Sequence, residues 1–170
     1  QPPLTSPRGR GRHVVEEVAI ALDQEIERLV GRQSGLAVDH GGVGLKRIIK
    51  ERIELAGLSV LDLGTDSEEP VDYPDSAEKL VAAMFASKVA RGVLVCGTGI
   101  GISIAANRHK GIRAALCYDE ETAILSRRHN DANILCIGGR KTEEHLSGRL
   151  VDLFLETEFE GGRHLRRVGK

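Results

Sequence analysis

One stretch, from Gly92 to Arg108, decides the fold, and it reads GVLVCGTGIGISIAANR. Its first residues form an apolar, β-branched run that is typical of a buried strand, and its end has the spacing of a helix. Between them lie glycines at the alternate positions 97, 99 and 101. A strand followed by a glycine loop and a helix is a building block of parallel sheets.

The spacing of these glycines excludes the common nucleotide-binding loops. The dinucleotide motif requires G-x-G-x-x-G, but isoleucines stand at 102 and 104, where the third glycine would fall. The segment GGVGLK at 41–46 also lacks the glycine directly before lysine that a phosphate loop requires. Three alternate glycines exceed what a tight turn needs, which favours a cradle of backbone N–H groups around an anion.

The same pattern repeats on both sides of this stretch. Five short β-rich runs alternate with helical segments, which predicts a Rossmann-like three-layer α/β/α sandwich with a five-stranded parallel sheet. In such folds, ligands bind where the carboxyl ends of the strands meet. The strands are expected at 35–38, 58–63, 92–96, 112–117 and 133–137, and the helices at 44–56, 75–90, 100–109, 119–129 and 142–156.

Two further segments precede this domain. Residues 1–12, QPPLTSPRGRGR, are rich in Pro, Gly and Arg, so we expect a disordered tail. Residues 13–34 form an N-terminal extension, in which the apolar positions of 14–30 repeat with the period of an amphipathic helix. The folded domain is therefore expected to span 35–170.

Composition excludes several classes of function. The chain has 24 Lys+Arg against 25 Asp+Glu, a net charge of −1 that argues against a nucleic-acid-coating protein. Aromatic residues make up 3% of it, too few for a base-stacking platform or a flavin site. No apolar run is long enough to span a membrane, and the start lacks an apolar signal core, so a cytoplasmic location is expected. The three cysteines form no CxxC pair that would indicate zinc.

Chemically useful side chains gather in a few places. Cys96 borders the glycine loop, a setting typical of a thiolate that serves as nucleophile or base, whereas Cys117 and Cys136 lie inside apolar runs and are expected to be inert and buried. Asp39 and His40 end the first strand. A dense polar segment, SRRHNDAN, occupies 126–133, and the segment EGGRHLRR at 160–167 places two arginines four residues apart, as a phosphate grip requires.

These segments together resemble one family, ribose-5-phosphate isomerase B, whose wider group includes allose-6-phosphate isomerases and the galactose-6-phosphate isomerase subunits. The resemblance covers about residues 35–168. It implies an aldose–ketose isomerase that acts through an enediolate, without metal or other cofactor, as a homodimer or homotetramer with the active site between subunits. It is carried by DHGGVGLK (39–46), DYPD (72–75), CGTGIGISIAANR (96–108), GIRAALC (111–117), SRRHNDANIL (126–135) and GGRHLRRV (161–168).

The resemblance also implies roles for individual residues. Cys96 matches the general base that moves a proton between C1 and C2, and His129 matches the acid/base that opens the furanose ring. Thr98 belongs to the anion hole for the enediolate. The remaining matches are substrate-binding positions: Gly97, Gly99, Ile100 and Gly101 in the anion hole, Asp39, His40 and Asn130 at the sugar oxygens, and Arg163 and Arg167 at the phosphate.

Ribose 5-phosphate and ribulose 5-phosphate are the expected substrates. A hexose 6-phosphate isomerase of the same family is the alternative within enzymes, because one extra carbon requires only a longer cavity. A non-catalytic phosphosugar-binding subunit is the alternative outside them. The presence of Cys96, Thr98 and His129 argues against that alternative, because a pure binder needs the arginines but neither a base nor a ring opener.

Overall fold

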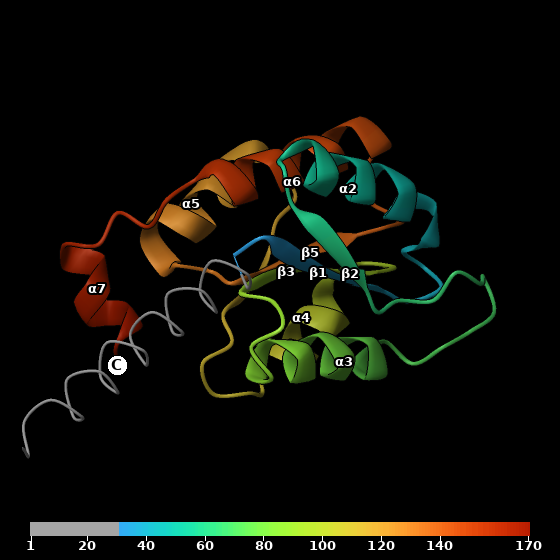
Figure 1. Ribbon diagram of the computed structural model, residues 1–170, viewed down its shortest axis with the longest axis horizontal. Helices are drawn as coiled ribbons and strands as arrows, with labels where there is room; N and C mark the ends of the chain where they lie inside the picture. Colours follow the sequence, from blue (N-terminus) through green and yellow to red (C-terminus); the bar gives the residue numbers. More distant parts are fainter. Residues whose placement is uncertain (1–30) are drawn as a thin grey trace, which may run out of the picture.

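The computed structural model describes residues 31–170, which fold as alternating strands and helices (Figure 1). The expectations for residues 1–12 and for the helix at 14–30 lie outside the described residues. The strands are β1 (Gln33–Val38), β2 (Ser59–Asp62), β3 (Arg91–Cys96), β4 (Ala114–Leu116) and β5 (Ile134–Gly138). The helices are α2 (Val43–Leu55), α3 (Tyr73–Phe85), α4 (Ile100–Ala106), α5 (Glu120–Asn130), α6 (Glu144–Glu156) and α7 (Arg163–Val168).

The five strands form one parallel sheet, as the sequence predicts, and the structure gives their order as β2-β1-β3-β5-β4. Helices α2, α5 and α6 cover one face, and α3 and α4 cover the other (Figure 1). Side chains of β3 alternate between the two layers: Val93 and Val95 pack under α2 and α6, whereas Leu94 and Cys96 pack against α3 and α4. The three-layer sandwich is therefore confirmed. None of the helices described in 31–170 is long and apolar enough to cross a membrane.

Several elements are shorter than predicted, among them α3, α4 and β4. Helix α3 stops at Phe85 rather than at 90, because Ser87 adopts a positive φ of 54° and turns the chain out of the helix. Phe85, the last residue of this helix, is 60% exposed. Strand β4 has three residues rather than the six predicted from its apolar run.

Asn107, just after α4, lies against the edge strand β4. Its side-chain amide donates to the carbonyl of Ala114 at 2.8 Å and accepts from the N–H of the same residue at 2.9 Å. The amide thus makes the pair of hydrogen bonds that a neighbouring strand would make.

The loops that follow β1, β3 and β5 meet at the carboxyl edge of the sheet. A Cβ added to Gly41 would lie 2.8 Å from the Gly97 nitrogen, and one added to Gly139 would lie 2.2 Å from the Gly41 oxygen. Only glycine permits so close an approach between backbones. Because β1 and β3 are adjacent while their helices lie on opposite faces, this is the switch point at which open α/β sheets bind ligands.

Candidate active site

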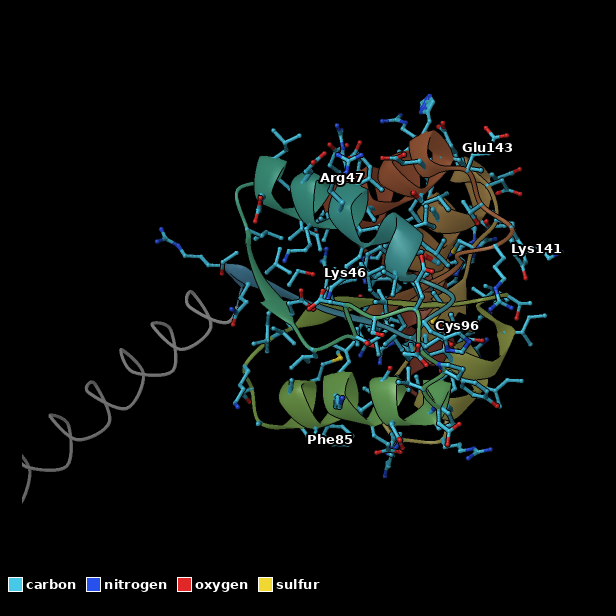
Figure 2. All side chains as sticks on the ribbon, turned by 90° about the vertical axis from the view of Figure 1, so that its right-hand side faces the viewer. Lys46, Arg47, Phe85, Cys96, Lys141 and Glu143 are labelled. Atoms are coloured by element: carbon cyan, nitrogen blue, oxygen red, sulfur yellow. The ribbon has the colours of Figure 1, made fainter. Side chains whose placement is uncertain are left out.

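Cys96 is the last residue of β3 and lies at the centre of this edge, between α2 and α3 (Figure 2). It is 4% exposed, and its Sγ accepts a hydrogen bond from the N–H of Gly99 at 3.1 Å. Gly99 has a φ of 77°, and a Cβ there would lie 2.5 Å from the Leu116 side chain. The glycine is therefore what turns an amide toward the sulfur.

In the other two cysteines, burial changes the acidity of the thiol. Burial raises the pKa of the Cys117 thiol and raises that of Cys136 well above its ordinary value. Both are buried, at 1% and 0% exposed. The prediction that they are buried is confirmed.

The rest of the glycine loop is stabilised by hydrogen bonds that involve the Thr98 side chain and a tyrosine hydroxyl. The Thr98 Oγ1 accepts from the N–H of Ile100 at 3.3 Å, and the hydroxyl of Tyr118 donates to the Thr98 carbonyl at 3.1 Å. Thr98 and Ile100 are exposed at the mouth of the loop. The amides of Gly99 and Ile100 are thus already engaged by the sulfur and the threonine hydroxyl.

Asp39 and His40 lie beside this loop. The carboxylate of Asp39 is buried and accepts from the N–H of Gly41 at 2.7 Å. The Nδ1 of His40 accepts from the N–H of Val71 at 3.3 Å. Because Gly41 packs on Gly97, the two loops form one polar surface at the carboxyl edge.

Two residues at this edge were missed by the sequence analysis. A Cβ on Gly97 would lie 3.4 Å from the Arg140 Nη1, so this guanidinium lies against the glycine loop. A Cβ on Gly101 would lie 2.7 Å from the ring of Tyr73, the first residue of α3. Arg140 follows β5 as the other candidates follow their strands, and Tyr73 belongs to the quoted segment DYPD, so both had a signal in the sequence.

The remaining predicted residues form a second cluster, which the structure places elsewhere. His129 and Asn130 end α5, and Arg163 and Arg167 lie one turn apart on α7. A groove of about 790 Å³ runs along β4, and its lining includes His129, Asn130, His164 and Arg167. The structure therefore brings His129, Asn130 and Arg167 together at this groove, with Arg163 on the same helix as Arg167, but without Cys96.

The two clusters lie at opposite ends of the sheet. Cys96 ends β3, whereas His129 and Asn130 precede β5, whose first residue Ile134 pairs with Gly92 at the start of β3. Four residue steps of strand separate these levels, or about 13 Å at ~3.3 Å per residue. In Figure 1, α7 accordingly lies on the left, whereas Figure 2 looks onto Cys96 from the right-hand side.

Within the second cluster, two imidazoles are stacked. The rings of His129 and His164 are 4.2 Å apart and nearly parallel, at 6°. His164 is 6% exposed, and burial, followed by the nearby His129 and Arg163, lowers its pKa below the usual 6.5. Arg163 Nε donates to His164 Nε2 at 3.3 Å, an assignment that agrees with a neutral ring.

These imidazoles and Glu160 are the metal-ligand candidates in residues 31–170. Their donor atoms all lie within 4.8 Å of one another. An imidazole binds a metal through a lone pair in the plane of its ring, and parallel stacked rings direct these lone pairs side by side rather than toward one ion. In this arrangement the group does not fit a tetrahedral metal site.

Comparisons with known proteins agree on one family. The family model described as Ribose/Galactose Isomerase matches residues 35–170. "Probable ribose-5-phosphate isomerase B" of Mycoplasma pneumoniae is 46% identical over 79% of this chain and 90% of its own length. "Ribose-5-phosphate isomerase B" of Escherichia coli is 45% identical over 76% and 87%. The crystal structure of a ribose 5-phosphate isomerase from Thermotoga maritima superposes with a TM-score of 0.78 at 48% identity, covering 81% of this chain and 94% of that one.

Proposed function

The chain belongs to the ribose/galactose isomerase family, and on that premise we propose that it interconverts ribose 5-phosphate and ribulose 5-phosphate. The observation that carries this proposal is the contact of Cys96 Sγ with the Gly99 N–H, which equips a loop of backbone amides with a base. The catalytic unit is residues 35–170, and the reaction needs neither a metal nor a cofactor, because proton transfers alone accomplish it.

The first step opens the sugar ring. His129 accepts the proton of the O1 hydroxyl, the C1–O4 bond breaks with its electrons moving to O4, and His129 returns a proton to O4. The C1 aldehyde forms in the same step, so atoms and charge balance. Asn130 beside it, and Asp39 and His40 at the other cluster, bind the sugar oxygens.

The second step moves hydrogen between carbons. The Cys96 thiolate removes the proton from C2 and the electrons move onto O1, which gives the enediolate. A proton then passes from the O2 hydroxyl to O1, and the Cys96 thiol returns its proton to C1 as the C2 carbonyl forms, which gives the ketose. A sugar C–H bond is a very weak acid, so the base, contributing about 10²–10⁴-fold, cannot suffice alone. Thr98 and the amides of Gly97 to Gly101 stabilise the enediolate, at about 3–4 kcal/mol for each well-placed donor. For Gly99 and Ile100 this requires that the N–H groups exchange their contacts with Cys96 Sγ and Thr98 Oγ1 for the substrate oxygen.

The phosphate is held by arginines at the far cluster. Arg163 and Arg167 lie on one face of α7, and both are exposed, so their guanidiniums can reach a ligand. Guanidinium groups bind phosphate through paired N–H donors. Anchoring the phosphate away from the reacting carbons orients C1 and C2.

The assembly follows from the separation of the two clusters. A proton donor must lie within about 3 Å of its target, and C1, C2 and O4 are neighbours in one sugar, so about 13 Å between strand levels is too far. A second copy of the chain supplies the missing half. The protein accordingly acts as a homodimer or homotetramer with sites shared between subunits.

The test is an isomerase assay of the purified protein with ribose 5-phosphate, allose 6-phosphate and galactose 6-phosphate in parallel, with and without chelator. We expect turnover of the pentose phosphate, unaffected by chelator, and a loss of about 10²-fold or more in Cys96→Ala. Cys136→Ala, which alters a buried cysteine outside the site, is the matched control and should retain activity. Preference for a hexose phosphate would reassign the substrate, and near-normal Cys96→Ala turnover would reassign the base.

A further inference from the structure

We propose that Glu160 is a positioning residue for His129, which holds the imidazole in place and offsets the charge that it gains during ring opening. The inference rests on the proposed function, since it assigns a helper to the ring-opening histidine. Glu160 Oε2 lies 3.6 Å from His129 Nε2 and 3.9 Å from His164 Nε2. A carboxylate beside a catalytic imidazole orients it and stabilises its protonated form.

A backbone hydrogen bond holds Glu160 beside His129. The N–H of Glu160 donates to the carbonyl of Arg128 at 3.1 Å, so the residue is tied to the last turn of α5, one position before His129. On its other side the chain turns directly into α7, where the N–H of His164 donates to the Gly161 carbonyl at 3.0 Å. A surface ion pair between long free side chains lacks such a tie and contributes little.

His164 does not compete with His129 for the carboxylate of Glu160. Because its Nε2 accepts from Arg163, the ring of His164 is held neutral and does not need the charge of Glu160. Its stacked ring, buried against α5, restricts the plane of His129. The His164 ring therefore restrains the His129 ring from its face, and Glu160 restrains it from its edge.

The surrounding charges make the carboxylate necessary. Between taking a proton from O1 and giving one to O4, His129 is positively charged, and Arg163 and Arg167 add to the positive charge of the same cluster. In the part of the chain described by the structure, Glu160 is the acidic residue paired with this ring. Removal of its charge should slow ring opening and leave the enediolate chemistry at Cys96 intact.

The experiment separates these two half-reactions. Ribose 5-phosphate is cyclic and must be opened, whereas ribulose 5-phosphate is acyclic because its C5 hydroxyl carries the phosphate. Isomerisation of ribose 5-phosphate is followed spectroscopically, and exchange of the C1 proton of ribulose 5-phosphate is followed by proton NMR in deuterated water. For Glu160→Gln we expect about a tenfold or greater fall in kcat on ribose 5-phosphate, toward the low end of acid–base effects, with the exchange rate within about twofold of wild type.

Three controls make the result decisive. Glu158→Gln removes the same charge from an exposed residue of the same loop and should match wild type in both assays. Glu160→Asp keeps the charge and should be more active than Glu160→Gln. The thermal unfolding midpoint should stay unchanged, since the Glu160 side chain is 59% exposed.

If the wild-type protein isomerises ribose 5-phosphate and Glu160→Gln does so at the same rate, the inference is overturned and the proposed function stands. So would an equal loss in both assays, because that is the sign of a general structural role. Failure of the wild-type protein to isomerise ribose 5-phosphate would instead overturn the proposed function itself.

Discussion

Subunit complementation offers the sharpest prediction. Cys96→Ala and His129→Ala are each expected to abolish isomerisation, because one removes the proposed base and the other the proposed ring opener. If each site takes Cys96 from one subunit and His129 from another, a heterodimer of the two variants contains one site in which both residues are intact. Its second site lacks both. The mixed protein should therefore regain about half of the wild-type activity per dimer, from two inactive parents.

The magnitude rests on the separation of the two residues along the sheet. Cys96 ends β3, and His129 precedes the residue that pairs with the start of β3, so about 13 Å lies between their levels at ~3.3 Å per residue. Each parent homodimer should retain at most about 1% of wild-type turnover, given the 10²–10⁴-fold contribution of acid–base groups. Recovery to about one half is thus easily distinguished from background.

The assay uses two affinity tags. Co-expression of the two variants with different tags, followed by purification on both, isolates the heterodimer for measurement with ribose 5-phosphate. The matched control pairs the double variant Cys96→Ala/His129→Ala with wild type. For shared sites this control is inactive, because every site then lacks one residue. An inactive variant pair together with a half-active control would refute shared sites and place both residues of each site in one chain.

Three other substitutions test the rest of the site and the buried histidine. Gly41→Ala places a Cβ 2.8 Å from the Gly97 nitrogen, so the two loops should part and kcat/KM should fall about 10²-fold, whereas Gly44→Ala, with open space around it, should be nearly neutral. Arg167→Ala should chiefly raise KM, and an unchanged KM would argue against phosphate contact. The pKa of His164 is lowered by burial, so the unfolded chain binds a proton that the folded one does not, and stability falls as pH falls below 6.5. The free energy of unfolding, measured with urea at about pH 5.5 and 7.5, should differ less between the two pH values in His164→Phe than in wild type.

The alternation of strands and helices was readable from the sequence because a parallel sheet buries whole apolar runs. The sequence did not reveal the ends of those helices and strands that local backbone conformation terminates. The end of α3 at Phe85 depends on the positive φ of Ser87, where no glycine or proline gives a signal. The apolar run of β4 continues on both sides of Ala114–Leu116, but only these residues pair with β5.

The sequence indicated which residues are candidates for the site, but it did not indicate how they are arranged in space. Cys96 follows a strand and His129 precedes one, and in a parallel sheet these positions lie at opposite edges, so the separation was implicit in the chain order. Arg140 and Tyr73 reach the loop only because Gly97 and Gly101 leave room for them, a contact between distant segments that no local pattern encodes. The roles of all these residues remain proposals.

The Asn107 amide on β4 has a consequence for how copies of this chain can meet. An uncovered edge strand invites another chain to extend the sheet, a route to fibrous aggregates. Here a side chain occupies the N–H and C=O of Ala114, in a strand of only three residues, so little backbone is left as a template. Growth by strand addition at β4 is thereby blocked. Association at this side has to proceed through side-chain surfaces, whose shape and charge select a specific partner face, instead of through a backbone edge that any extended chain can join.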